Sequence, residues 1–364
     1  MITHKKYMKN LSFGVSLAPY RLDFYNYLSE HFNCTIYFQL KGFKGQLFST
    51  ENLEKKCTYK PLYLETIKIR ERHIVKHLSD LVKNNRPNVI LVPEFSLLTI
   101  QVILYKFITR KKFKIISLCD DSYDILMGNG FTYLHHLARK IVVPFLDDLI
   151  LVDTKAVEWY QEHYHKGIWM PIIRNEKKLL PYYETLKEKA LQLKSRYQNK
   201  IILLFVGRLI DVKNIPLLLQ AYKQLGNTYK LIIIGDGEYM SKLKSIALKE
   251  NLDIDFLGKK ENDELFVWYQ AADIFILPSY REAFGAVTNE ALLAGCKCVI
   301  SKHAGSSCLI EEGINGYTFD PYSTDELVDC IKKATTLLSP NRKSQMTVTF
   351  TECMNNMINK LNQP

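Results

Sequence analysis

The sequence predicts an α/β protein with two doubly wound domains, each built on a parallel sheet. Short, fully apolar segments alternate with amphipathic segments of helical period along most of the chain, which is typical of parallel strands joined by helices. The chain has 364 residues, of which 47% are apolar, enough for two hydrophobic cores. We divide it into a first domain at 1–172, a second at 173–343 and a helical tail at 344–364.

The alternation is clearest in the second half. Gly207, Gly235 and Pro278 each follow an apolar segment and mark its end. We expect strands at 201–206, 230–234, 254–257, 273–277, 297–301 and 316–319, and helices at 216–225, 239–250, 263–270, 286–294 and 324–338.

The first half repeats the pattern less regularly. We expect strands at 11–17, 35–39, 88–92, 114–118 and 148–152, and helices at 20–32, 66–84, 94–109 and 132–143. The predicted helix at 66–84 carries Lys68, Arg70, Arg72, Lys76 and Lys83 between apolar residues. Such a basic amphipathic helix suits a membrane surface, and a merely solvated helix is the open alternative.

Two glutamates, Glu282 and Glu290, flank the predicted start of the helix that follows the strand at 273–277. A helix N-terminus leaves backbone N–H groups free, and such groups bind phosphate. A carboxylate accepts two hydrogen bonds at once, which suits a vicinal diol. A phosphate site between two diol-binding carboxylates is what a nucleotide sugar needs. The alternative is a pair of ordinary surface carboxylates.

Two cations follow the strand at 201–206. Gly207 permits a sharp turn, after which Arg208 and Lys213 project at the carboxyl edge of the sheet. A diphosphate gains negative charge as its bond to a sugar breaks, and fixed cations stabilise that charge. Gly235 begins a similar turn, but Met240 replaces the third glycine of a dinucleotide fingerprint.

These segments resemble the retaining glycosyltransferases of family 4, of the type that builds bacterial surface polysaccharides. The resemblance lies in the Glu-x7-Glu element at 282–290, the Gly-Arg-Leu…Lys-Asn motif at 207–214 and the segment at 292–301. It implies the GT-B fold, in which two Rossmann-like domains face a cleft, with the helical tail packed back on the first domain.

The resemblance also implies roles for individual residues and the absence of a metal or other cofactor. Glu282 would contact the donor sugar and Glu290 the ribose, while Arg208 and Lys213 would hold the diphosphate. The remaining donor contacts would come from backbone groups at Phe284, Gly285 and Ala286 and from the turns at Gly207 and Gly235.

The first domain is expected to bind the acceptor. Tyr20 and Arg21 follow the first strand at a predicted helix N-terminus, where an acceptor phosphate could sit; the alternative is a packing Tyr beside a surface Arg. Asp120 and Asp121 follow the strand at 114–118 and could orient an acceptor hydroxyl. A polar loop without a role and a metal site at 120–124 are the alternatives. Cys119 stands where relatives often carry a His.

The distribution of charge and the cysteines of the sequence indicate where the protein is located and what it binds. Residues 1–175 carry 25 Lys and Arg against 16 Asp and Glu, a net charge of +9, whereas residues 176–364 carry +2. An anionic partner of the first half is therefore expected: nucleic acid, an anionic membrane or a lipid-phosphate substrate. Of these, we do not expect nucleic acid to be a partner. Eight scattered cysteines and the lack of an apolar leader predict a cytoplasmic protein, peripheral to the inner face of the membrane if the basic face binds lipid.

The predicted function is transfer of a sugar, with retention of anomeric configuration, from a nucleoside diphosphate sugar to a hydroxyl of a glycan or lipid-linked acceptor. The biological setting implied by the resemblance is capsule or lipopolysaccharide synthesis. Two alternatives remain open: a nucleotide-sugar epimerase of the same fold, and a nucleotide-sugar-binding scaffold without turnover.

Overall fold

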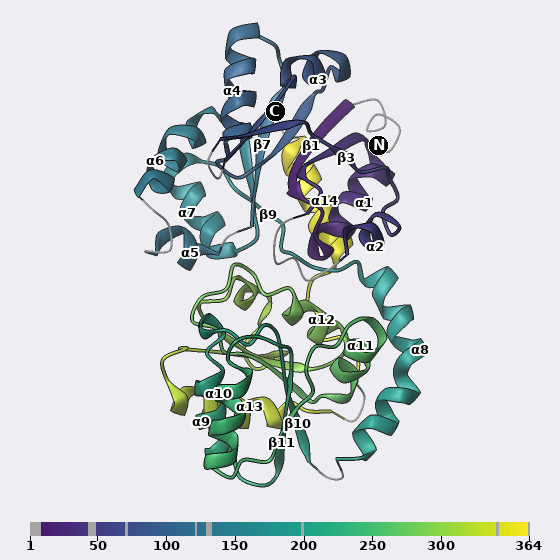
Figure 1. Cartoon of the computed structure of the whole chain (residues 1–364), viewed down its shortest axis with the longest axis vertical. Helices are drawn as coiled ribbons and strands as arrows, with labels where there is room; N and C mark the ends of the chain where they lie inside the picture. Colours follow the sequence, from purple (N-terminus) through teal and green to yellow (C-terminus); the bar gives the residue numbers. More distant parts are fainter. Residues whose placement is uncertain are drawn as a thin grey trace. The chain divides into compact units, whose positions relative to one another are not determined.

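The computed structural model describes residues 9–42, 49–69, 72–120, 122–128, 133–197, 200–339 and 342–362. The chain divides into two compact units (Figure 1). Unit 1 comprises residues 1–120, 129–170 and 357–364, and unit 2 comprises residues 121–128 and 171–356. Each unit contains one parallel sheet, and unit 1 has an additional hairpin.

The sheet of unit 1 has the strand order β3-β2-β1-β6-β7-β8-β9. Its strands are β1 (Lys9–Ser16), β2 (Asn33–Leu40), β3 (Leu62–Tyr63), β6 (Val89–Pro93), β7 (Lys114–Cys119), β8 (Asp148–Leu151) and β9 (Ile168–Trp169). The order reverses between β1 and β6, which pair in parallel. Ligands of doubly wound sheets bind beyond the carboxyl ends of the strands at such a reversal.

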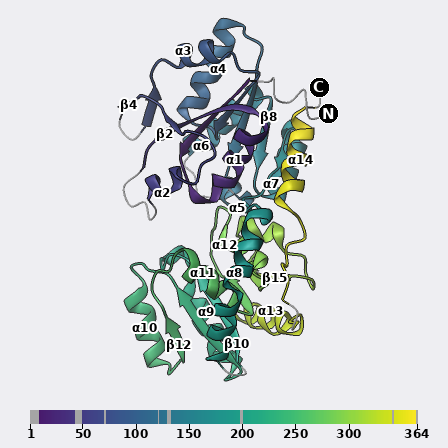
Figure 2. The same cartoon turned by 90° about the vertical axis from the view of Figure 1, so that its right-hand side faces the viewer.

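Helices cover this sheet. They are η2 (Pro19–Arg21), α1 (Leu22–His31), α2 (Thr50–Glu54), α3 (Leu78–Asn85), α4 (Leu97–Thr109), α6 (Tyr133–Val142), η3 (Val143–Phe145) and α7 (Thr154–Tyr164). The last turns of α14 (Phe350–Leu361) join them (Figures 1 and 2). Met357 and Ile358 lie near Leu28 of α1 and Ile150 of β8, and Lys114 Nζ donates to the Leu361 carbonyl at 3.2 Å.

The sheet of unit 2 has the order β12-β11-β10-β13-β14-β15 and reverses between β10 and β13. Its strands are β10 (Ile201–Val206), β11 (Tyr229–Ile234), β12 (Ile254–Phe256), β13 (Ile274–Leu277), β14 (Lys297–Ser301) and β15 (Gly316–Phe319). Most residues of the central strands are buried on both faces, which explains the uninterrupted apolar runs in the sequence. The predicted fold class, two Rossmann-like domains with parallel sheets, is confirmed.

The helices of unit 2 are α8 (Glu176–Ser195), α9 (Ile215–Leu225), α10 (Met240–Lys249), α11 (Asn262–Ala271), α12 (Val287–Leu293) and α13 (Thr324–Thr336), with the short α5 (Tyr123–Met127) and two 3₁₀ turns, η4 (Asp211–Lys213) and η5 (Gly305–Leu309). On one face of the sheet, α9 and α13 bury Leu218, Ala221, Leu327 and Ile331 in an extensive hydrophobic core. A smaller core joins α8 to α12 through Leu179, Tyr183 and Leu293.

The prediction of one basic helix at 66–84 is wrong. The structure has an antiparallel hairpin there, β4 (Thr66–Ile69) with β5 (Arg72–Val75), followed by α3. Arg70 lies outside the described residues. The period-two alternation of Ile67, Lys68 and Ile69 favours a strand over a helix. The basic residues of this segment therefore do not form a helical face.

Two long helices, α7 and α8, are absent from the sequence-based prediction. Both begin at side-chain caps: Asp153 Oδ1 accepts from the Lys155 N–H at 3.0 Å, and Asn175 Oδ1 accepts from the Lys177 N–H at 3.1 Å. The helical tail, expected at 344–364, becomes helical only at Phe350. Thr349 and Glu352 form a reciprocal capping box that fixes this start.

Candidate functional site

Two turns of unit 2 pack together beside the reversal of its sheet. The turn at Gly207 follows β10, and the turn at Gly235 follows β11. Gly207 N donates to the Ile234 carbonyl at 3.0 Å, and Leu209 N donates to the Asp236 carbonyl at 2.9 Å. Gly235 has φ +145°, and a Cβ there would overlap the Gly207 carbonyl oxygen. Glycine is therefore needed for the loop that carries Arg208 to lie where it does.

An ion pair joins the loops that follow β10 and β13. Lys213 Nζ contacts a carboxylate oxygen of Glu282, and the two side chains are only 13% and 17% exposed. Ser279 Oγ donates to the same carboxylate at 3.3 Å. The Tyr280 N–H donates to the Val212 carbonyl at 2.9 Å, which fixes one loop against the other. Two predicted site residues, 69 positions apart, thus meet at the reversal point.

Arg208, on the same loop as Lys213, is exposed. Among the described residues it has no ion-pair partner. A diphosphate beside Lys213 would therefore meet a second cation whose charge is not already matched.

The segment between Glu282 and α12 offers a row of backbone donors. Within the described residues, no acceptor lies in hydrogen-bond reach of the N–H groups of Phe284, Gly285 or Ala286. The segment is fixed from behind, because Ser306 N donates to the Phe284 carbonyl at 2.7 Å and Gly305 N to the Glu282 carbonyl at 3.2 Å. Gly285 has φ +87°, a conformation that favours glycine. Adjacent N–H groups of this kind bind anions.

Glu290 lies on α12 and is held by a residue that the sequence analysis missed. Arg174 Nη1 donates to Glu290 Oε1 at 3.0 Å, and Arg174 N donates to Asn289 Oδ1 at 2.8 Å. Tyr183 donates to the Glu290 carbonyl at 3.0 Å, and burial together with the nearby Glu290 carboxylate holds the pKa of Tyr183 well above its ordinary value. Arg174 lies between β9 and α8, where the sequence pattern showed only a domain junction.

The predicted acceptor residues of unit 1 lie at a separate cavity. Arg21 is buried in η2 and forms an ion pair with Asp120. Burial lowers the pKa of Arg21, but the Asp120 carboxylate more than offsets this, so the pKa is raised. Arg21 is therefore already charge-matched, whereas Tyr20 is 43% exposed at the cavity wall. Asp121 lies outside the described residues.

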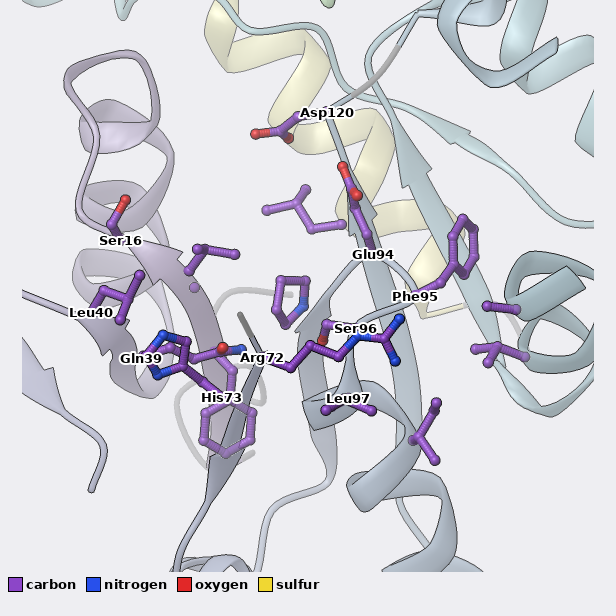
Figure 3. A pocket seen from close by; sticks show the side chains of 18 of the residues that line it. Ser16, Gln39, Leu40, Arg72, His73, Glu94, Phe95, Ser96, Leu97 and Asp120 are labelled. Atoms are coloured by element: carbon purple, nitrogen blue, oxygen red, sulfur yellow. The ribbon is translucent and has the colours of Figure 1, made fainter. Parts of the chain in front are cut away.

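The cavity holds about 1500 Å³ and opens at the reversal between β1 and β6 (Figure 3). Glu94, which the sequence analysis also missed, points its carboxylate toward Asp120. It has φ +38°, a strained conformation held by hydrogen bonds from Thr99 Oγ1 at 2.9 Å and Ser117 Oγ at 3.0 Å to its carbonyl. Two carboxylates thus lie at one end of the cavity, an arrangement suited to sugar hydroxyls.

Among the residues that the structure describes, no group of three His, Cys, Asp or Glu side chains could hold a metal ion. No described helix has the length and apolar character needed to cross a membrane.

Comparison with known proteins gives a family match for one segment and solved structures of similar fold. Residues 187–346 match the family model described as Glycosyl transferases group 1. This segment contains Arg208, Lys213, Glu282 and Glu290. HepE of Anabaena, solved in complex with UDP, resembles the chain with a TM-score of 0.73 at 16% identity, covering 98% of each chain. Solved structures of this kind have the GT-B fold, and the predicted fold is confirmed at that level.

Among the curated relatives, one is named for lipopolysaccharide and one for a lipid-linked sugar. Lipopolysaccharide 1,2-N-acetylglucosaminetransferase of Salmonella typhimurium is 30% identical over 213 residues, which cover 55% of this chain and 56% of the relative. UDP-Gal:alpha-D-GlcNAc-diphosphoundecaprenol alpha-1,3-galactosyltransferase of Escherichia coli is 28% identical over 183 residues, 49% of this chain and 45% of the relative. The chain thus spans about half the length of these relatives.

Proposed function

We propose that this protein is a retaining glycosyltransferase that moves a sugar from a nucleoside diphosphate sugar to a hydroxyl of a glycan or lipid-linked acceptor in surface polysaccharide synthesis. The observation that carries the proposal is the grouping in unit 2 of Lys213, Glu282 and the N–H groups at 284–286, with Glu290 on the helix that follows. The family match over 187–346 supports the same chemistry. The UDP complex of HepE makes uridine diphosphate sugars the first donors to test.

In this proposal the donor diphosphate lies on the N–H groups of Phe284, Gly285 and Ala286. Glu282 accepts hydrogen bonds from hydroxyls of the sugar, and Glu290, oriented by Arg174, accepts them from the ribose. Lys213, which neutralises Glu282 in the absence of donor, then lies between that carboxylate and the diphosphate. Arg208 then supplies a cation for the diphosphate that is not already paired within the described residues.

Catalysis is assigned to charge stabilisation. As the bond between the anomeric carbon and the diphosphate oxygen breaks, negative charge grows on the diphosphate, and Lys213 and Arg208 stabilise it. The acceptor hydroxyl attacks from the face that the diphosphate leaves, and its proton passes to a diphosphate oxygen, so the configuration is retained. No side chain acts as a nucleophile, and no metal is required.

Turnover of a panel of nucleotide sugars tests the proposal, with nucleoside diphosphate release measured in the presence and absence of candidate acceptors. We expect release that depends on the acceptor, and an NMR coupling constant that shows the donor's anomeric configuration in the product. Conversion of the donor without any acceptor would instead identify an epimerase. Binding of donor without conversion in either condition would identify a scaffold.

A further inference from the structure

The cavity of unit 1 is polar at one end and apolar over most of its walls. Asp120, Glu94 and Ser16 lie near the carboxyl ends of the strands, at the polar end (Figure 3). The apolar walls come from α4 and from the segment α6–η3. They are formed by Leu97, Ile100, Ile103, Leu104 and Phe107 on one side and by Leu137, Ala138, Ile141, Val142 and Phe145 on the other.

The apolar groove between α4 and α6–η3 is exposed to an unusual degree. Phe107 is 78% exposed, and Ile141 and Phe145 are 56% and 57% exposed. Isolated apolar residues on a surface need no explanation, but a continuous apolar lining of one cavity marks a binding site. Along α4 the lining runs from Leu97 to Phe107, a rise of about 15 Å. A groove of this length fits an extended alkyl chain.

Cations also line the cavity. Lys68, Arg72 and His73 line the cavity from the β4–β5 hairpin. In Figure 3 the Arg72 guanidinium reaches toward Ser96 and Leu97 at the start of α4, whose first turn contains no acidic residue. Gln101 ties the hairpin to α4, accepting from Val75 N at 3.1 Å and donating to its carbonyl at 3.0 Å. An anionic group is favoured at this position.

Size supports a ligand larger than a single sugar. The cavity volume of about 1500 Å³ exceeds the roughly 300–1,000 Å³ that is usual for a small-molecule site. Its three zones follow one another: carboxylates for hydroxyl groups, cations for a phosphate, and an apolar groove for a chain.

We infer that the unit 1 cavity binds an amphiphilic acceptor that carries a saccharide, a phosphate group and an alkyl chain. The saccharide lies at Asp120 and Glu94, the phosphate at Arg72, and the chain along Leu104, Phe107 and Ile141. The identification of this ligand as the acceptor rests on the proposed function. The binding of an alkyl phosphate in this cavity does not, and is tested separately.

Calorimetry with three probes tests the inference: farnesyl diphosphate below its micellar concentration, inorganic diphosphate and farnesol. Farnesyl diphosphate should bind at least about tenfold more tightly than either fragment, because only it occupies both zones. Equal affinities of farnesyl diphosphate and inorganic diphosphate would overturn the assignment of the groove. Equal affinities of farnesyl diphosphate and farnesol would overturn the assignment of the cations.

A matched pair of variants tests where the alkyl chain lies. Phe107→Glu should weaken binding of farnesyl diphosphate about tenfold or more, because a carboxylate in the groove would lose hydration beside an apolar chain. Ile108→Glu is the control, since Ile108 is 77% exposed on the same helix but does not line the cavity. Equal weakening by both variants would show that the effect does not depend on lining the groove, and would overturn the inference.

A second pair of variants tests where the phosphate lies. Arg72→Gln should weaken binding of farnesyl diphosphate roughly tenfold to hundredfold and leave farnesol unaffected. Lys112→Gln, an exposed cation beyond the end of α4, should change neither. UDP binding to unit 2 should be unchanged in all four variants, which shows that they fold. A variant that loses farnesyl diphosphate binding but keeps UDP binding therefore bears on this inference alone. A wild-type protein that binds farnesyl diphosphate but not UDP would refute only the proposed function.

Discussion

Replacing Lys213 by methionine removes the cation that pairs with Glu282 while keeping the length of the side chain. Removing one partner of a buried ion pair costs about 3–5 kcal/mol. The side chains of Lys213 and Glu282 remain 13% and 17% exposed, so a cost of about 1–3 kcal/mol is expected here. The Glu282 carboxylate would keep only the hydrogen bond from Ser279 among the contacts described above.

The double variant Lys213→Met, Glu282→Gln separates stability from catalysis. With the unmatched charge gone, the free energy of unfolding should return to within about 1 kcal/mol of wild type, because neutral replacement of both partners leaves no buried charge. Turnover should stay at least about 10²-fold below wild type, because the cation beside the leaving diphosphate is still missing.

Urea unfolding followed by tryptophan fluorescence measures the stabilities, and nucleoside diphosphate release measures turnover. Glu282→Gln alone completes the cycle and gives the coupling energy of the pair. A double variant that regains turnover would show that Lys213 serves only to neutralise Glu282. A single Lys213→Met variant with wild-type stability would show that the pair does not form in solution.

Three further predictions follow from the same geometry. Glu290→Gln should weaken binding of plain nucleoside diphosphate, whereas Glu282→Ala should leave that binding unchanged and weaken only binding of the nucleotide sugar. Calorimetry with both ligands measures these affinities, and equal losses for both ligands in both variants would contradict these roles. Arg208→Ala should lower turnover by at least about 10²-fold, and wild-type turnover should survive excess chelator; activity lost in chelator and restored by manganese would require a metal. Gly235→Ala should lower the free energy of unfolding by about 1–3 kcal/mol, since its Cβ meets the Gly207 carbonyl, and unchanged urea unfolding would argue against the packing of these turns.

The strands of unit 2 were predictable because a strand that is buried on both faces consists almost entirely of apolar residues. Strands such as β10 and β13 are uninterrupted apolar runs, and each is followed by a glycine or proline. Once such strands are recognised, the order of the elements is known, and the doubly wound topology places a reversal of strand order in the sheet. Lys213 and Glu282 could therefore be assigned to one edge of the sheet. Their ion pair could not, since it depends on how two loops fold against each other.

The sequence-based prediction fails where tertiary contacts, and not the local sequence pattern, determine the structure. Residues 66–75 have charges and apolar residues at spacings that fit a helix loosely and a strand better, and pairing in the hairpin settles the matter. Arg174 and Glu94 escaped notice because neither belongs to a motif. Arg174 becomes functional only through its contact with Glu290, and Glu94 only through a backbone conformation that sequence does not reveal.

A crystal structure of the chain with a bound uridine diphosphate sugar tests the proposed function most directly. The diphosphate should accept hydrogen bonds from the N–H groups of residues 284–286 and contact Lys213 and Arg208. The ribose diol should lie on Glu290 and the sugar hydroxyls on Glu282, with Lys213 drawn toward the diphosphate. A nucleotide bound elsewhere in unit 2, or with its ribose away from Glu290, would contradict the assignment of the donor site.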